Sequence, residues 1–294
     1  MTSGDVVGAL DIGGTHVSGG RVNVASAALE TGSRAFERLP TTAGRDELLA
    51  AISRVTRSIA EPHVACLGVS VPGPFDYARG VSEITHKLES LHGIDLREEL
   101  QAAAIQAPPT IRFLNDAEAF LLGEWWAGAA RGHVRAIGVT LGTGLGSAFS
   151  EEGEIVRSGT GVPLGGELYA TRFRGAPVEH SISRAALLAA YGRGSGEGVD
   201  VEQIADRAIA GEPSARRVFA ELGTSLGQFL APWLRGFEPS CLVVGGSIAR
   251  AWDLFEGTLL AGLGPIRGLR AVTVAAQLED AQLLGAAFYA TDPR

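Results

Sequence analysis

Two short glycine-threonine turns are the first residues of this sequence that could do chemistry. Gly13-Gly14-Thr15 follows an apolar run at residues 6–10, and Gly142-Thr143-Gly144 follows another at residues 136–141. A tight turn after a strand points consecutive N–H groups at one place, and glycine removes the side chains that would keep a phosphate away. The pair therefore predicts phosphate binding. Ordinary hairpin turns remain an alternative, as does a broken dinucleotide motif, although no helix follows residues 142–146 as that motif requires.

Two aspartates occur where a phosphate site could use them. Asp11 ends the first apolar run, and its carboxylate could hold Mg²⁺ beside the phosphates, directly or through water. Asp116 follows the apolar residues 111–114 at a strand-to-helix junction, where it could take a proton from a hydroxyl during phosphoryl transfer. From the residues alone, a turn or capping role for Asp11 and an N-cap role for Asp116 stay open.

Composition excludes several classes of protein. The 294 residues carry 33 acidic and 25 basic side chains, a net charge of −8, which argues against coating nucleic acid or an anionic membrane. The single lysine, Lys87, has no glycine before it, so a Walker A loop is excluded. Neither a signal peptide nor an apolar run of about 18 residues occurs, which predicts a cytoplasmic protein. Cys66 and Cys241 flank apolar runs and are expected in buried strands.

Apolar patterning predicts the elements that position these residues. Strands are expected at residues 6–10, 17–24, 67–71, 111–114, 136–141, 241–244 and 271–275, and helices at 46–60, 95–104, 117–130, 179–191, 201–210, 214–237 and 283–289. The succession of strand, glycine turn and hairpin at residues 6–24 returns at residues 136–156. This repeat predicts two similar α/β lobes with a ligand cleft between them.

Five ordered motifs, spread over nearly the whole chain, resemble those of a known family. They are residues 9–15 (ALDIGGT), 68–74 (GVSVPGP), 113–119 (FLNDAEA), 140–146 (TLGTGLG) and 243–246 (VVGG). The chain resembles a sugar kinase of the ROK family, the group that includes many bacterial glucokinases. The resemblance implies a duplicated α/β fold of the actin-like, hexokinase-like ATPase type, which is ribonuclease H-like. It also implies a smaller lobe of residues 1–115 with 283–294, a larger lobe of residues 116–282, and a central cleft.

The resemblance implies a role for each matching residue. Asp116 would be the catalytic base, and the sugar would be bound by Asn115, Asp116, Glu167, Glu179 and Gly73. Phosphate would be bound by Gly13, Gly14, Thr15, Gly142, Thr143 and Gly144, adenosine by Gly245 and Gly246, and Mg²⁺ by Asp11, directly or through water. The implied ligands are ATP, Mg²⁺ and a small sugar, with no nucleic acid or membrane partner, and the implied assembly is a homodimer.

The departures from the family pattern concern the sugar site and zinc. Relatives continue the first glutamate into Gly-Glu-Ile-Gly-His and a cysteine-rich zinc loop. Here the run is Gly166-Glu167-Leu168-Tyr169-Ala170, so Ala170 stands at the histidine position. No cysteine lies between Cys66 and Cys241, and His180 alone cannot build a tetrahedral site, so no zinc site is expected. The missing histidine also calls a preference for glucose itself into question.

Three functions are therefore weighed. The first is ATP-dependent phosphorylation of a hydroxyl on a hexose-like sugar, an aminosugar or a cyclitol. The second is a sugar-sensing ROK regulator, but such proteins carry a DNA-binding winged helix ahead of the first phosphate loop, and Asp11 comes after only ten residues. The third is a relative with other chemistry, such as a glucokinase that uses polyphosphate as donor.

Overall fold

The structure, a computed structural model, describes residues 6–40, 43–61, 64, 66–85, 88–104, 110–195 and 199–291. The chain divides into two compact units, one of Met1–Gly128 with Glu279–Arg294 and one of Ala129–Leu278. The expected lobe boundary at residue 115 differs from that of the compact units by about one helix. The expected boundary at residue 283 differs by a few residues. Over the described ranges, no helix combines the length and the apolar character needed to span a bilayer.

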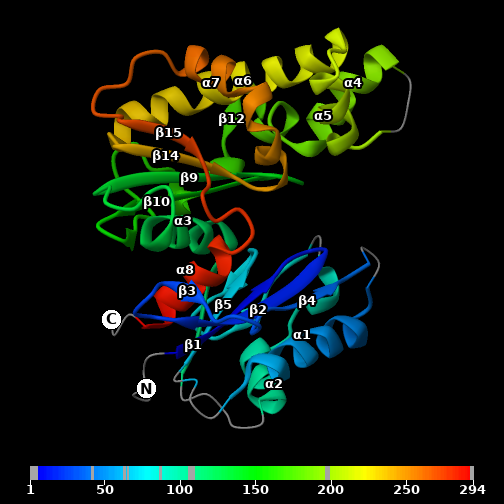
Figure 1. Ribbon diagram of the computed structural model, residues 1–294, viewed down its shortest axis with the longest axis vertical. Coiled ribbons are helices and arrows are strands. Elements are labelled where there is room, and N and C mark those ends of the chain that lie inside the picture. Colours follow the sequence, from blue (N-terminus) through cyan, green and yellow to red (C-terminus); the bar gives the residue numbers. More distant parts are fainter. Residues whose placement is uncertain are drawn as a thin grey trace. The chain divides into compact units, whose positions relative to one another are not determined.

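The first unit is built on one mixed sheet (Figure 1). Its strands run in the order β3-β2-β1-β5-β8, and β4 also pairs with β2. β1 is antiparallel to β2, whereas β1 with β5 and β5 with β8 are parallel pairs. The strands are β1 (Val6–Ile12), β2 (His16–Asn23), β3 (Ala28–Leu29), β4 (Ala35–Arg38), β5 (Leu67–Val71) and β8 (Ile111–Asn115). A small ribbon of β6 (Phe75–Asp76) and β7 (Val81–Ser82), followed by the turn η1 (Glu89–Leu91), lies between β5 and β8 in the chain.

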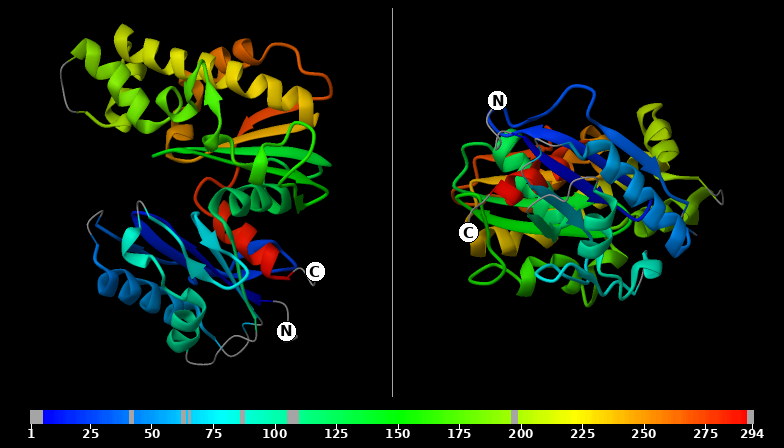
Figure 2. Two further views of the ribbon diagram at one scale, coloured as in Figure 1. Left: turned by 180° about the vertical axis from the view of Figure 1, so that it is seen from behind. Right: turned by 90° about the horizontal axis from the view of Figure 1, so that it is seen from below.

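Two pairs of helices cover this sheet. These are α1 (Arg45–Ile59) with α2 (Leu96–Ala103), and α3 (Asp116–Ala127) with α8 (Ala281–Thr291) (Figures 1 and 2). α1 turns the apolar residues Leu48, Ile52 and Val55 inward at helical spacing, and all three are buried. Asp95 caps α2 by accepting a hydrogen bond from the Glu98 N–H.

Glycines allow the backbone of α8 to contact the backbones of α3 and β5 directly. A Cβ at Gly285 would lie 1.8 Å from the Ala119 carbonyl oxygen, and one at Gly68 would lie 1.9 Å from the Ala286 carbonyl oxygen. No side chain fits in such a gap, so the backbones themselves are in contact. This packing is why α3 belongs to the first compact unit rather than to the second.

The second unit repeats the plan of the first. Its sheet has the order β11-β10-β9-β14-β15, with an antiparallel β9–β10 hairpin and β9, β14 and β15 in parallel. The strands are β9 (Arg135–Leu141), β10 (Leu145–Glu151), β11 (Glu154–Ile155), β14 (Cys241–Gly245) and β15 (Ala271–Val274), with a ribbon of β12 (Arg172–Phe173) and β13 (Ala176–Pro177). The predicted repeat is thus confirmed: each sheet contains an antiparallel hairpin whose first strand pairs in parallel with a later strand.

Helices and short turns complete the second unit. The helices are α4 (Arg184–Ser195), α5 (Val201–Ile209), α6 (Pro213–Phe237) and α7 (Glu256–Leu263), and the turns are η2 (Leu164–Gly166), η3 (Leu168–Ala170), η4 (Val178–His180) and η5 (Ser247–Leu254). The prediction of one helix over residues 179–191 was wrong at its start. Residues 178–180 form a separate turn, and α4 begins only at Arg184, after Ser183 accepts a hydrogen bond from the Ala186 N–H.

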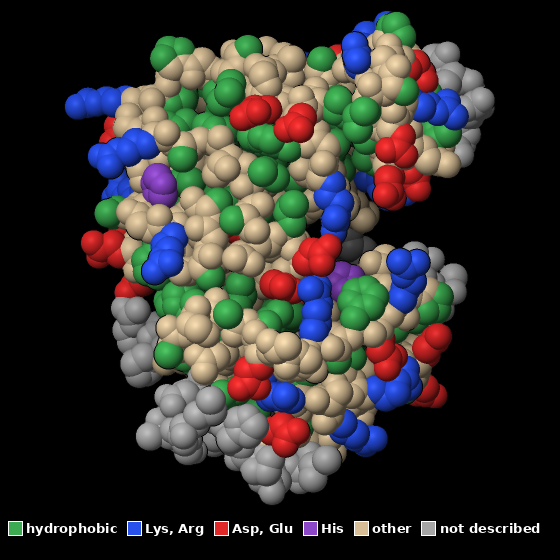
Figure 3. Space-filling view, in the orientation of Figure 1, with side chains coloured by type: hydrophobic (Ala, Val, Ile, Leu, Met, Phe, Trp, Pro, Cys, Tyr) green, Lys and Arg blue, Asp and Glu red, His purple; other side chains and the backbone are tan. Residues whose placement is uncertain are grey.

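The surface carries both signs of charge. On the described part of the face shown in Figure 3, acidic and basic side chains occur over both units. Several charged side chains form ion pairs, such as Arg34–Asp280 at 2.7 Å and Arg54–Glu37 at 2.6 Å.

Candidate active site

The first glycine turn joins β1 to β2. Gly13 donates its N–H to the carbonyl oxygen of His16 at 2.9 Å, which closes the hairpin. Leu39 donates its N–H to the Thr15 carbonyl at 2.7 Å, which holds the turn against the segment after β4. Thr15 is exposed and Gly13 and Gly14 are half-buried, so the turn is open to a ligand.

Asp11 lies inside β1 and not at a cap. The residue is buried, at 8% exposure. Oδ1 accepts a hydrogen bond from the Ser70 hydroxyl at 2.7 Å, and Oδ2 lies 3.3 Å from Nε2 of His16. The alternative of a turn or capping aspartate therefore does not describe this residue.

The chemistry of Asp11 fits a magnesium ion that is held jointly with a nucleotide. Mg²⁺ usually takes one or two protein carboxylates and completes its shell with phosphate and water oxygens. Asp11 offers one carboxylate two residues before the first glycine turn. Among the described residues, no cluster of three or more His, Cys, Asp or Glu could hold a metal by itself, so the phosphates would have to supply the remaining ligands.

The predicted sugar residues of the first unit gather at the carboxyl ends of β5 and β8. Asn115 is paired with Val71 in the sheet, and its Oδ1 accepts the Ala117 N–H at 2.9 Å. Its Nδ2 donates to the Tyr77 hydroxyl at 3.2 Å. A Cβ at Gly73 would lie 3.4 Å from that hydroxyl and 3.9 Å from Asn115 Nδ2, so Gly73, Tyr77 and Asn115 are neighbours.

Asp116 is the first residue of α3 and not its N-cap. Asn115 has the extended backbone of an N-cap residue and supplies the capping oxygen. One oxygen of Asp116 also accepts the Ala117 N–H, at 2.9 Å. Its side chain is half-buried beside Asn115, and a role as a base does not conflict with this geometry.

The second glycine turn is coupled to Glu179. Gly142 donates its N–H to the Gly144 carbonyl at 3.1 Å and accepts the Arg184 N–H at 2.9 Å. Glu179 Oε1 accepts the N–H of Leu145 at 3.0 Å. A Cβ at Gly144 would lie only 2.1 Å from that same oxygen. Glu179 is therefore seated directly on the turn that contains Thr143.

Glu167 is anchored to the same hairpin through Ser147 of β10. The Ser147 hydroxyl donates to the Gly166 carbonyl at 2.6 Å and accepts the Leu168 N–H at 2.9 Å. The Tyr169 phenol lies close enough to the Glu167 and Glu179 carboxylates to interact with their charges. Burial, followed by these two carboxylates, raises the pKa of Tyr169, so its phenol keeps its proton.

The two glycines predicted to bind adenosine, Gly245 and Gly246, lie next to the second glycine turn. Gly245 ends β14, and Gly246 has a φ of +84°, a backbone conformation that favours glycine. A Cβ at Gly246 would lie 2.4 Å from the Leu141 carbonyl oxygen, at the end of β9. The next residue, Ser247, places its hydroxyl 3.7 Å from a Cβ position at Gly142. The second unit thus brings Gly142–Gly144, Glu167, Glu179 and Gly245–Gly246 together around one hairpin.

The segment after η3, where the family pattern predicts a zinc loop, carries the short β12–β13 ribbon. Ala170 ends η3 immediately before it, and His180 ends η4 after it. Cys66 and Cys241 are buried in different units. Burial raises the pKa of the Cys66 thiol, which makes it a poor metal ligand.

Sequence reasoning missed four residues of these sites: His16, Ser70, Tyr77 and Tyr169. His16 and Ser70 contact Asp11, Tyr77 contacts Asn115, and Tyr169 contacts Glu167. Ser70 lies inside a motif and the other three lie within a few residues of one, but only the register of the strands and turns brings these side chains to their partners.

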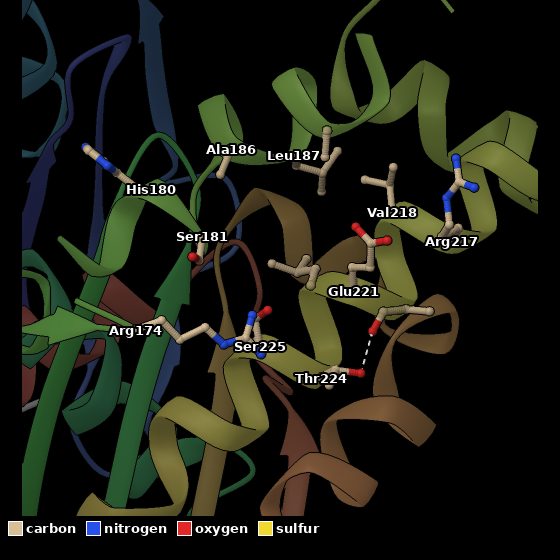
Figure 4. Close-up of a pocket in the computed structure, with 13 residues that line it drawn as sticks. Arg174, His180, Ser181, Ala186, Leu187, Arg217, Val218, Glu221, Thr224 and Ser225 are labelled. Atoms are coloured by element: carbon tan, nitrogen blue, oxygen red, sulfur yellow. Dashed lines mark hydrogen bonds between the residues drawn. The ribbon is translucent and has the colours of Figure 1, made fainter. Parts of the chain in front are cut away.

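A cavity of about 440 Å³ lies elsewhere in the second unit, between α4, α6 and the β12–β13 ribbon (Figure 4). Arg174, Arg217 and Glu221 are its charged lining residues, and His180 also lines it. Figure 4 shows His180 and Arg217 at opposite ends of the cavity, and Arg174 already donates to Gln228 at 2.6 Å. These groups do not converge on one point, and no ligand is assigned to this cavity.

Known proteins resemble this chain over most of its length. A glucokinase of Thermotoga maritima is 28% identical over 95% of each chain. An N-acetyl-D-glucosamine kinase of Haemophilus influenzae is 28% identical over 84% of this chain and 86% of its own. The structure of a ROK family glucokinase from Streptomyces griseus in complex with glucose and AMPPNP superposes with a TM-score of 0.78 at 25% identity, over 97% of this chain and 99% of that one.

The last of these likenesses confirms the predicted fold class, the duplicated actin-like, hexokinase-like ATPase fold. The model of the ROK family itself matches residues 7–292. That match takes in both glycine turns, the Asn115-Asp116 junction and both glutamates. The chain therefore belongs to the ROK family, and to the sugar kinases within it.

Proposed function

We propose that this protein transfers the γ-phosphoryl group of ATP to a hydroxyl of a hexose or an aminosugar. The observation that carries the proposal is the contact of Glu179 with the second glycine turn, where Glu179 Oε1 accepts a hydrogen bond from the Leu145 N–H at 3.0 Å. A residue proposed to bind the acceptor is thereby fixed to a turn proposed to bind the donor. Such an arrangement suits a transfer reaction, in which the two substrates must be held in register.

The acceptor is proposed to be bound by the residues that the family resemblance implies. Asn115, in contact with Tyr77, and the nearby Gly73 would meet the sugar. Glu167 and Glu179 would accept hydrogen bonds from its hydroxyls. Asp116 would take the proton of the attacking hydroxyl as its oxygen forms a bond to the γ-phosphorus and ADP leaves.

The donor is proposed to be ATP, with its phosphates on the backbone N–H groups of the two glycine turns and its adenosine against Gly245 and Gly246. Asp11 would hold Mg²⁺, which neutralises charge on the transferring phosphate when it is bound. The Streptomyces griseus relative, which binds the ATP analogue AMPPNP, supports this choice of donor.

The acceptor is proposed to be a hexose-like compound other than glucose. Ala170 stands where relatives carry a histidine, and the phenol of Tyr169 lies beside Glu167 instead. A site that lacks one polar contact to a substrate hydroxyl binds that substrate less well. The N-acetyl-D-glucosamine kinase among the relatives supports including aminosugars.

A coupled assay of ADP release tests the proposal. The panel contains hexoses, aminosugars and cyclitols as acceptors and ATP, GTP or polyphosphate as donors, with Asp116→Asn as the matched inactive control. We expect turnover with ATP and at least one hexose or aminosugar, and a higher kcat/KM for another acceptor than for glucose. No turnover with any acceptor would contradict the kinase assignment, glucose as the best acceptor would contradict the specificity, and a preference for polyphosphate would contradict the donor.

The expected homodimer also stays a prediction. Static light scattering on the purified protein measures the mass in solution, and a monomer's mass at assay concentration would contradict it.

A further inference from the structure

The carboxylate of Asp11 is held from two sides by side chains of two other strands. Ser70 is paired with Asp11 across the parallel β1–β5 ladder and is completely buried. Its hydroxyl donates to Oδ1 at 2.7 Å. His16, at the start of β2, brings Nε2 to 3.3 Å from Oδ2. Each carboxylate oxygen therefore has one protein partner.

The imidazole of His16 is itself fixed in place. Its ring stacks on that of Phe36 with centroids 5.4 Å apart and planes inclined by 17°. On the side of the turn, a Cβ at Gly13 would lie 2.9 Å from the ring carbon Cε1. Nδ1 lies 3.4 Å from the Thr15 hydroxyl. This stacking gives a reason for Phe36, which is 55% exposed, to be aromatic on the outside of a strand.

A carboxylate with one partner on each oxygen still has lone pairs to offer. Ser70 and His16 fix the rotation of the Asp11 carboxylate, so its remaining lone pairs point in one defined direction. Hydrogen-bonded partners of this kind orient metal ligands, and their loss weakens metal binding. Packing of the hydrophobic core does not require this arrangement. It places a carboxylate next to an open glycine turn, where a ligand could reach it.

We propose that His16 and Ser70 are positioning residues that orient Asp11 toward the magnesium ion of the bound nucleotide. The inference rests on the proposed function, since it requires a nucleotide at the first glycine turn. It differs from a direct contact between His16 and a phosphate, which would strengthen nucleotide binding with or without the metal. Positioning of Asp11 acts only when magnesium is present.

Calorimetric titration of ATP into the full chain separates these cases. It is performed without acceptor, first across a series of Mg²⁺ concentrations and then in EDTA. His16→Phe keeps an aromatic ring against Phe36 but removes the donor to Asp11. His16→Gln supplies an amide N–H in its place, and Ser70→Ala removes the other donor. Thr56→Val is the matched control: it also loses a buried hydroxyl of the first unit, which donates to the Ile52 carbonyl at 2.7 Å within α1.

The expected result is a shift in magnesium dependence alone. In His16→Phe and Ser70→Ala, the Mg²⁺ concentration that gives half-maximal enhancement of ATP binding rises by about 10- to 100-fold. His16→Gln recovers most of that loss, Thr56→Val matches the wild type, and the Kd for ATP in EDTA changes less than about 2-fold in all variants. Thermal denaturation of each variant confirms that it is folded at the titration temperature.

Two results would overturn the inference while leaving the kinase assignment intact. One is an unchanged magnesium dependence in both folded His16→Phe and Ser70→Ala. The other is an equal loss of affinity in EDTA and in Mg²⁺ for His16→Phe, which would make His16 a phosphate ligand. If the wild-type chain binds no ATP even with Mg²⁺, the proposed function falls and this inference falls with it.

Discussion

Replacing Gly144 by alanine should damage the acceptor site without unfolding the protein. The new Cβ would lie 2.1 Å from Glu179 Oε1, and ordinary contact begins at 3.4 Å, so that oxygen must retreat by about 1.3 Å. The hydrogen bond that it accepts from the Leu145 N–H, now 3.0 Å long, is then lost. Because the clashing atom is the end of a flexible side chain, the backbone can remain in place.

The size of the effect follows from the bond that is lost. A hydrogen bond to a charged group contributes about 1.5–3 kcal/mol. At about 1.4 kcal/mol for each factor of ten, misplacing Glu179 should lower kcat/KM for the acceptor by about 10- to 100-fold. The assay is coupled ADP release at saturating ATP with the best acceptor, together with thermal denaturation of the same preparation.

A double-mutant cycle shows whether the loss acts through Glu179. In a Glu179→Ala background the clash is absent, so Gly144→Ala should then have little further effect. Gly142→Ala is the control, because a Cβ there meets nothing nearer than the Ser247 hydroxyl at 3.7 Å. Its effect should add to that of Glu179→Ala. An unchanged kcat/KM in Gly144→Ala, or additive effects of Gly144→Ala and Glu179→Ala, would refute the reasoning.

Four further outcomes are expected. Asp116→Asn should lower kcat by about 10²–10⁴-fold while calorimetry finds ATP binding unchanged, and retention of half the wild-type kcat would contradict the base assignment. Glu167→Gln should raise the KM of the acceptor much more than that of ATP, and equal changes in steady-state kinetics would argue against a sugar contact. A zinc-selective chelator should leave activity and Tm unchanged, whereas stoichiometric zinc found by elemental analysis would contradict a zinc-free site. Gly68→Ala should destabilise the protein by about 1–3 kcal/mol or more in urea unfolding, because its Cβ meets the Ala286 backbone, whereas Gly257→Ala, which meets nothing, should not.

The sequence predicts most of the fold because its signals are local. Apolar runs that end at glycine turns mark β1 and β9, and the helical spacing of Leu48, Ile52 and Val55 marks α1. The repeat of strand, turn and hairpin then predicts two similar sheets. These patterns depend on neighbours in the chain, which a single sequence displays directly.

The contacts between elements are not visible in this way. The start of α4 was misplaced because glutamate is common in helices. In the structure the Glu179 carboxylate accepts the Leu145 N–H instead, and the helix is capped by Ser183. Ser70 reaches Asp11 only because β1 and β5 are in one particular parallel register. A shift of that register by one residue would turn Ser70 to the opposite face of the sheet.

The docking of α8 onto α3 and β5 also sets an order of events while the chain is being made. A ribosome produces β1, β5, β8 and α3 first, and then residues 128–280, before any of α8 exists. During that interval the backbone around Gly68 and Gly123, which α8 later covers, is open to solvent. Residues 129–278 form an uninterrupted stretch that contains every strand of their own sheet, so that unit can fold as soon as it emerges. A chaperone that binds the nascent chain would thus bind the amino-terminal unit, because that unit stays incomplete until α8 has been made.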